Sequence, residues 1–146
     1  MITTEITITG DLNITVYDQY GLVKESRDVN NLVVQTGKET IASLLGAGVN
    51  KPTHLGLGSD NTPTVTALTD LTTPVGARIP FNIVSTLGNV TTYVAIFNPL
   101  DNVGTFAEAA LFTDLTVGTM FARTTFNDIS ITTVDKMVIT WNIRVN

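Results

Sequence analysis

Histidine, serine and aspartate occur close together in the middle of the chain, at His54, Ser59 and Asp60. These are the residue types of a catalytic triad, in which the imidazole accepts the proton of the serine nucleophile. The surrounding sequence does not favour this chemistry. The Gly-x-Ser-x-Gly turn that presents such a serine is missing, and His54 lies among glycines and leucines typical of a strand. We therefore interpret His54 as a structural residue and expect no catalytic residues and no enzymatic activity.

Two glycine-containing segments match phosphate-binding loops only in part. Gly56-Leu57-Gly58 begins like a dinucleotide fingerprint, but the third glycine is missing and Pro63 stands where the phosphate-binding helix should begin. Gly37-Lys38 begins like a P-loop, but Leu32 occupies the position of its first glycine. We expect no nucleotide and no other cofactor.

Carboxylates at Asp60, Asp70 and Asp101 fall in loop-like segments. Such groups can bind calcium or act as an acid and base pair, but the spacing of an EF-hand is missing. The chain has no cysteine and therefore no thiolate metal site. We interpret the carboxylates as solvated turn residues and expect no metal, and a loop that binds calcium remains the alternative.

The composition restricts the class of protein. A chain of 146 residues with 43% hydrophobic and 14% charged residues is enough for one folded domain. The net charge of −5 and the scattered basic residues argue against a nucleic-acid partner, which requires clustered lysine and arginine. The N-terminus lacks the pattern of a signal peptide, and apolar runs are far shorter than the ~20 residues that span a membrane. We expect a soluble protein that is made in the cytoplasm and has no membrane partner.

Alternation of apolar and polar residues predicts β-strands along most of the chain. The clearest case is the final strand, in which Met137, Ile139, Trp141 and Ile143 share one face. A two-residue Gly88-Asn89 connection predicts a tight hairpin. Further strands are predicted at residues 6–8, 12–16, 22–34, 54–58, 79–87, 90–98, 105–113, 119–126 and 136–145, with a turn at residues 18–21.

One segment has the pattern of a helix. Thr36 and Glu39 have the spacing of a capping box, and Ile41, Leu44 and Leu45 would line one face before Gly46 ends the helix. A helix of two to three turns is stable only when it packs on other elements. We expect it to cover one open end of the β-structure.

These elements predict an all-β protein, an antiparallel β-sandwich that is jelly-roll-like, with one short helix. Residues 10–146 would form a single β-sandwich domain, preceded by an N-terminal arm at residues 1–9. Residues 59–75 read as a long polar loop, a kind of segment that is often functional. The predicted core contains Phe112, Phe121, Ile139 and Trp141, whereas the three tyrosines, Tyr17, Tyr20 and Tyr93, are candidates for exposure.

Several motifs, in their order and spacing, resemble those of small structural proteins of tailed-bacteriophage virions. The similarity includes Val16 to Val23, Asn31 to Gly37, His54 to Pro63 and the segment Thr66 to Asp70 with Arg78. It continues through the C-terminal block, which reads E-A-A-L-F (Glu108 to Phe112), G-T-M-F-A-R-T-T-F (Gly118 to Phe126) and I-T-W-N-I (Ile139 to Ile143). The resemblance extends from about residue 12 to the end of the chain.

This resemblance implies a capsid decoration, or cement, protein in the virion. Such a protein binds the outer surface of the capsid shell and stabilises it by bridging major capsid protein subunits. The implied partners are the major capsid protein and further copies of the chain in a homotrimer. The alternatives are a tail, neck, baseplate or fibre component, and a carbohydrate-binding or receptor-binding module. The absence of coiled-coil heptads and of a long shaft favours decoration over a fibre.

An extended arm can add a strand to a neighbouring protein, and uncharged, threonine-rich faces can pack without burying unpaired charge. We therefore expect the partner contacts to come from the arm and from the first part of the long loop. The predicted contact residues are Ile2, Thr3, Thr4, Glu5, Ile6, Thr7, Ser59, Asp60, Asn61, Thr62 and Thr64.

Overall fold

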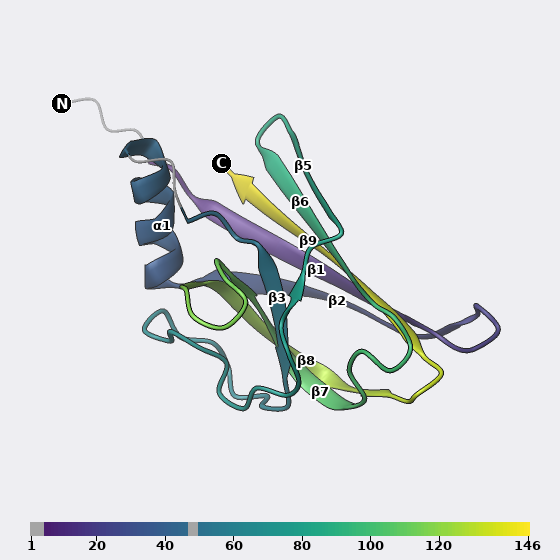
Figure 1. Cartoon of the computed structure of the whole chain (residues 1–146). Coiled ribbons are helices and arrows are strands. Elements are labelled where there is room, and N and C mark those ends of the chain that lie inside the picture. The colour runs from purple at the N-terminus through teal and green to yellow at the C-terminus, as the bar shows by residue number, and fades with distance from the viewer. Residues whose placement is uncertain (1–4, 47–49) are drawn as a thin grey trace.

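A computed structural model describes residues 5–46 and 50–146 of the chain. The described part contains nine strands and one helix (Figure 1). In chain order the elements are β1 (Ile8–Tyr17), β2 (Val23–Val33), α1 (Gln35–Gly46), β3 (His54–Gly58), β4 (Ile79–Pro80), β5 (Ile83–Leu87), β6 (Val90–Phe97), β7 (Gly104–Phe112), β8 (Met120–Ile131) and β9 (Lys136–Val145). The predicted all-β class with one short helix is confirmed.

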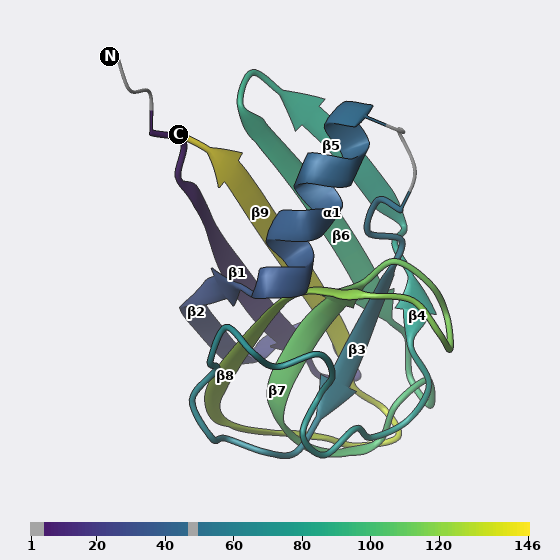
Figure 2. The ribbon, with the colours of Figure 1, turned by 90° about the vertical axis from the view of Figure 1, so that its left-hand side faces the viewer.

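The nine strands form one antiparallel sheet in the order β4-β3-β7-β8-β2-β1-β9-β6-β5. The sheet curls, so that β3, β7 and β8 lie over β1, β9 and β6 (Figures 1 and 2). Where the halves meet, the ladder between β2 and β8 is short and contains the pairs Leu32 with Arg123 and Val33 with Ala122. We predicted a jelly-roll-like sandwich, and that finer arrangement is not confirmed because the strands belong to one continuous sheet.

Side chains from both halves of the sheet meet in one hydrophobic core. Strict alternation on β1, β6 and β9 directs every second residue inward, which is the pattern that the sequence predicts for β9. The predicted core residues Phe121, Ile139 and Trp141 are buried there. Tyr93 is buried too, which makes the prediction of its exposure wrong, whereas Tyr20 is 78% exposed.

A second, smaller cluster lies outside this core and contains Phe112 with Val34, Leu71, Ala110 and Met120. Phe112 is therefore buried as predicted, but it faces away from the main core. Residues 106–112 of β7 are buried on both faces because other segments cover the outer face of this part of the sheet. The long loop supplies Leu71 to that cover.

Helix α1 lies across one end of the curled sheet, as predicted, and contacts β8 (Figure 2). The predicted capping box is wrong because Thr36 lies inside the helix, where its hydroxyl donates a 2.7 Å hydrogen bond to the carbonyl oxygen of Met120. Gly37 allows this close contact, since a methyl group at its Cα would overlap the carbonyl oxygen of Phe121. Ile41 packs on the core, Leu44 is 36% exposed, and the side chain of Leu45 lies outside the described part.

Two further sequence predictions concern strand ends. The Gly88-Asn89 hairpin is confirmed, with Gly88 at φ 59°, the conformation that a type II′ turn requires at its first position. The strand predicted at residues 79–87 is divided into β4 and β5. Proline at position 80 lacks the N–H that a continuous ladder needs, which gives a physical reason for the break.

The predicted arm ended at residue 9, but Ile8 and Thr9 belong to β1, which pairs with β9 from its first residue. In the described residues, no helix has both the length and the apolar character needed to cross a lipid bilayer.

Candidate contact surfaces

The long loop between β3 and β4 is attached to the sheet along much of its length. Its first residue, Ser59, donates its backbone N–H to the carbonyl oxygen of Thr73 at 3.0 Å. Gly58 forms an isolated bridge with Pro74, and Val75 donates to the carbonyl of Leu57 at 2.9 Å. The returning part of the loop therefore runs beside β3, and the loop covers the outer face of β7 and β8 instead of extending freely into solvent.

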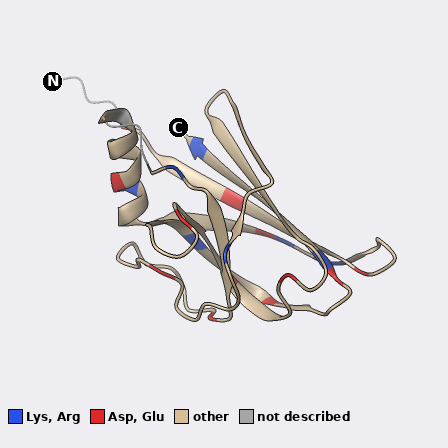
Figure 3. Cartoon of the chain, viewed as in Figure 1, with Lys and Arg blue, Asp and Glu red and all other residues tan. Residues whose placement is uncertain are grey.

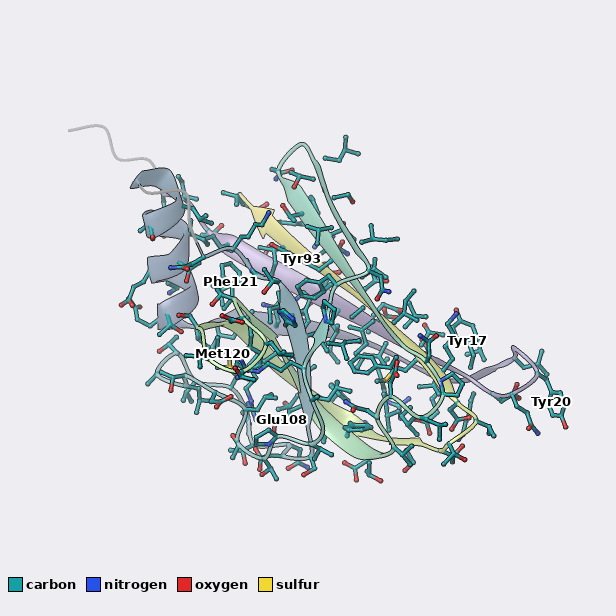
Figure 4. All side chains as sticks on the ribbon, viewed as in Figure 1. Tyr17, Tyr20, Tyr93, Glu108, Met120 and Phe121 are labelled. Carbon is teal, nitrogen blue, oxygen red and sulfur yellow. The ribbon has the colours of Figure 1, made fainter. Side chains whose placement is uncertain are left out.

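A buried ion pair lies beneath this loop. Glu108 on β7 and Arg123 on β8 are both fully buried, and the Nε atom of Arg123 donates to the Oε2 atom of Glu108 at 2.8 Å. Figure 4 labels Glu108 on β7, beside the loop. Two opposite charges can remain buried only when each is paired and hydrogen-bonded, because removing a charge from water is costly.

The remaining hydrogen-bonding groups of the pair hold the loop at both ends. Arg123 donates to the carbonyl oxygen of Thr62 and to the hydroxyl of Thr64, both at 2.9 Å, and contacts Oδ2 of Asp60 at 3.2 Å. Glu108 accepts the backbone N–H groups of Thr72 at 3.1 Å and of Thr73 at 2.8 Å. The two charged side chains thus bind both the outgoing and the returning parts of the loop.

These contacts divide the predicted contact residues of the loop into two groups. Asp60 and Thr64 are half-buried and their side chains face Arg123, so they anchor the loop. Ser59, Asn61 and Thr62 are exposed, although the hydroxyl of Thr62 also donates to Asp60. Only this exposed group is open to a partner.

The sequence interpretation missed Glu108 and Arg123. The sequence does contain a sign of this pair. Glu108 is the single charged residue in the apolar segment from Ala107 to Phe112, and Arg123 directly follows the apolar segment from Met120 to Ala122. A charge at such a position is buried only when it is paired, and the two charges are of opposite sign.

The predicted N-terminal arm is only partly described. Ile2, Thr3 and Thr4 lie outside the described residues. Thr7 exchanges two backbone hydrogen bonds with Asn146, of 3.0 and 2.7 Å, and so is joined to the C-terminal end of the sheet. Glu5 and Ile6 are exposed, with Ile6 at 66%, and they line a groove of about 870 Å³ together with the end of β2 and helix α1.

A third surface, which the sequence interpretation missed, lies at the opposite end of β1. We call it the apolar tip and define it by five exposed side chains in or next to three connections: Tyr20, Leu22, Val23, Leu100 and Val134. Figure 1 shows the β1–β2, β6–β7 and β8–β9 connections at this end, and Figure 4 labels Tyr17 and Tyr20 there. A groove of about 480 Å³ is lined by residues from all three connections, including Tyr17, Pro99 and Val134.

Leu100 at the apolar tip has an unusual backbone conformation. It lies in a turn in which Asp101 donates its N–H to the carbonyl of Asn98 at 3.0 Å, and its φ is 77°. Glycine or asparagine is the usual residue at a positive φ, because a Cβ atom is strained there. The leucine side chain is nevertheless 72% exposed. The fold thus holds an apolar side chain in solvent at a position where glycine, which has no Cβ atom, would be less strained.

The residues that suggested chemistry have structural partners. The Nδ1 atom of His54 lies 2.8 Å from the hydroxyl of Thr53, and the length of β3, roughly 16 Å, separates His54 from Ser59. Asp70 contacts Arg78 at 3.6 Å, and Asp101 accepts the backbone N–H of Asn98 at 2.8 Å. Within residues 5–46 and 50–146, no group of three histidine or acidic side chains is placed to hold a metal ion.

Other charged side chains are also held in pairs, and their distribution leaves the β5–β6 hairpin without charge (Figure 3). Lys24 contacts the buried carboxylate of Asp135 at 2.7 Å, and Arg144 contacts Asp11. Burial alone would raise the pKa of Asp135, but the hydrogen bonds from Lys24 and Thr132 outweigh it and lower that pKa below its ordinary value. Burial is likewise outweighed at Asp11, where Asn142 and Arg144 lower the pKa.

The chain was compared with protein-family models, with curated proteins and with solved structures, and none of them matches it.

Proposed function

We propose that the chain is a structural protein of a bacteriophage virion that decorates the capsid. In this proposal it binds the outer surface of the shell and stabilises the shell by bridging major capsid protein subunits. The observation that carries the proposal is the apolar tip, where five side chains in or next to three connections are exposed: Tyr20, Leu22, Val23, Leu100 and Val134. Apolar side chains gathered on a surface are typical of a protein contact.

The strain at Leu100 supports a binding role for this surface. A leucine at a φ of 77° costs about 1–3 kcal/mol relative to a relaxed backbone, and its exposed side chain contributes little to the core. A cost of this kind is typical of positions that serve binding. Burying the side chain against a partner would contribute about 1.5–3 kcal/mol, which is enough to offset the strain.

The environment of the charged residues also supports a structural role. Glu108 and Arg123 are enclosed by the loop that they hold, so the pair is not open to a substrate. The resemblance to virion structural proteins supplies the kind of partner, and the size of the chain agrees with one domain that binds by its surface.

The same resemblance also allows a second proposal, a tail, neck or baseplate component. Such a component differs from a decoration protein in its position and copy number on the particle. A carbohydrate-binding module has less support: of the ten aromatic side chains, all within the described residues, only Tyr20 is largely exposed. Stacking on sugars would require more exposed rings.

Immunogold electron microscopy of purified virions, with an antibody raised against this chain, tests the proposal. Decoration predicts gold particles distributed over the whole head. Gold confined to one vertex or to the tail would favour the tail, neck or baseplate component, and unlabelled particles would refute a virion role.

A further inference from the structure

Strand β5 is an unprotected edge of the sheet. Among residues 5–46 and 50–146 it pairs only with β6, in a regular ladder without a bulge, and every one of its five residues is exposed. Leu87 is 87%, Ile83 54% and Val84 53% exposed. Soluble proteins usually protect such an edge with a lysine, a proline, a bulge or a covering segment. The strand Ile-Val-Ser-Thr-Leu has no lysine or proline, so it is suited to pairing with another strand.

We propose that β5 pairs with β5 of a second copy of this chain, which gives a two-fold symmetric dimer with one sheet continuous across both copies. This inference goes beyond the virion role, because it concerns the purified chain in solution.

The backbone of β5 presents the groups that this pairing needs. In an antiparallel ladder closed by a two-residue turn, the residues flanking the turn, here Leu87 and Val90, form a hydrogen-bonded pair, and the pairs then alternate. Val84 and Thr86 therefore direct their N–H and C=O groups away from β6. The 2.9 Å contact between the hydroxyls of Thr86 and Thr91 agrees with this, because side chains lie closer in pairs without backbone hydrogen bonds.

The residues of β5 are complementary to those of a second β5 that runs antiparallel to it. With Ser85 on the two-fold axis, Val84 of one copy faces Thr86 of the other, and Ile83 faces Leu87. The Val84 and Thr86 pairs exchange backbone hydrogen bonds, while Ser85 faces its own equivalent. Apolar and β-branched residues thus meet on both faces of the joined sheet, which is a favourable combination for cross-strand pairs.

Charge favours a second copy at this edge. The chain carries a net charge of −5, so two copies repel each other wherever their carboxylates approach. Residues 79–100, which include β4, β5 and β6, contain no charged residue at all. Among the described residues, Lys51 is the one charged residue that lines the groove beside β5, and it is basic. Two copies can therefore meet along β5 without bringing acidic groups together.

The other edge of the sheet explains why this assembly would end at two copies. Strand β4 has only two residues, and one of them is Pro80, which has no N–H to donate. Pairing of β5 with β5 uses the same surface of both copies, so the contact closes on itself. The structure thus offers one open edge and one blocked edge.

Measurement of the molar mass of the purified chain by size-exclusion chromatography with light scattering tests the proposal. We expect a mass of twice 15.7 kDa, about 31 kDa. In the variant Ser85→Lys, two like charges face each other across the axis, and we expect the dimer dissociation constant to rise roughly tenfold or more. Ser26→Lys is the matched control, because Ser26 is exposed on β2, four strands away from β5, and it should leave the dimer intact.

A second test is independent of the charge change. The chain has no cysteine, so Ser85→Cys introduces a single thiol at the axis. Directly opposed residues without backbone hydrogen bonds have Cα atoms about 4.5 Å apart, which a disulfide can bridge. We expect mild oxidation to give a covalent dimer for Ser85→Cys and none for Ser26→Cys.

Three results would overturn the proposal. They are a monomeric mass at all concentrations up to about 200 µM, equal cross-linking of the two cysteine variants, and a mass near three times 15.7 kDa, the trimer that the resemblance predicts. Circular dichroism of each variant shows whether it is folded. If Ser85→Lys fails to fold, Thr86→Pro replaces it, since this change removes an outward N–H and leaves the ladder with β6 intact.

Discussion

The guanidinium of Arg123 and the carboxylate of Glu108 form an ion pair, 2.8 Å from Nε to Oε2, in which both side chains are fully buried. The pair lies across neighbouring strands, and its remaining groups bind the backbone or side chains of five loop residues between Asp60 and Thr73. The position of the loop therefore depends on two residues that lie in the sheet.

Arg123→Met should lower the free energy of unfolding by roughly 3–5 kcal/mol, because it leaves the Glu108 carboxylate buried without its partner. Urea denaturation followed by the fluorescence of the single tryptophan, Trp141, measures this loss. The control is Arg27→Met, at a partly exposed pair with Glu25 at 3.5 Å, where the loss should stay below about 1 kcal/mol. Equal losses in the two variants would contradict the structural role of the buried pair.

Gly37→Ala should destabilise the protein although alanine is the better helix former. The gain in helix propensity is about 1 kcal/mol, but the added methyl group would overlap the Phe121 carbonyl and push α1 away from β8, a cost of about 1–3 kcal/mol or more. Gly46→Ala is the control, since no atom of the described residues lies within 4 Å of the added methyl group. Thermal unfolding should therefore show a lower midpoint for Gly37→Ala and an unchanged or higher one for Gly46→Ala.

Leu100→Gly separates binding from folding. Glycine relieves the strain at a φ of 77°, so we expect the free energy of unfolding to stay within about 1 kcal/mol of the wild type. If the apolar tip contacts the capsid, attachment to particles should weaken about tenfold or more. Val117→Gly removes an exposed apolar side chain from the β7–β8 connection and should leave attachment unchanged. Co-sedimentation with particles measures attachment, and full attachment of Leu100→Gly would exclude the tip.

Because the pKa of Asp135 is lowered on folding, this carboxylate should stabilise the protein near neutral pH and lose that effect in acid. A carboxylate whose pKa is depressed on folding stabilises the protein above its unfolded value of about 3.9, and this stabilisation is lost as the pH falls through the folded value. The stability difference between wild type and Asp135→Asn should therefore be greatest near neutral pH and disappear in acid. Urea titrations between about pH 2 and pH 7 measure it.

The control for that titration is Asp128→Asn, the same change at an exposed position of β8. It should follow the wild-type dependence on pH. A constant difference between wild type and Asp135→Asn over the whole range would contradict the role assigned to Lys24 and Thr132.

Much of the core could be predicted from the sequence, because alternation is a local property of a strand. Trp141 and Ile139 follow from the pattern of β9, and the Gly88-Asn89 hairpin follows from its turn residues. The burial of Tyr93 was predictable by the same rule, since it shares a face of β6 with Ala95 and Phe97.

The contact surfaces could not be predicted in the same way, because they depend on residues far apart in the chain. Thr36 and Glu39 have the spacing of a local helix cap, yet the hydroxyl of Thr36 donates to the carbonyl oxygen of Met120 on β8. A tertiary contact therefore replaces the local cap. The loop after Ser59 is polar and long, and only Arg123, some sixty residues later, shows that it is held in place. The apolar tip likewise requires three connections to meet.

The paired backbones of Thr7 and Asn146 bring the two described ends of the chain together, at the end of β1 that lies away from the apolar tip. A short linker could therefore join these ends, and new ends could be opened in the exposed Gly88-Asn89 turn without removing a core strand. Labels attached at Thr7 and at Asn146 would lie side by side. A label at this end of β1 would leave the apolar tip free to bind. The position of the label on a particle, determined by electron microscopy, would then show which end of the protein faces the shell.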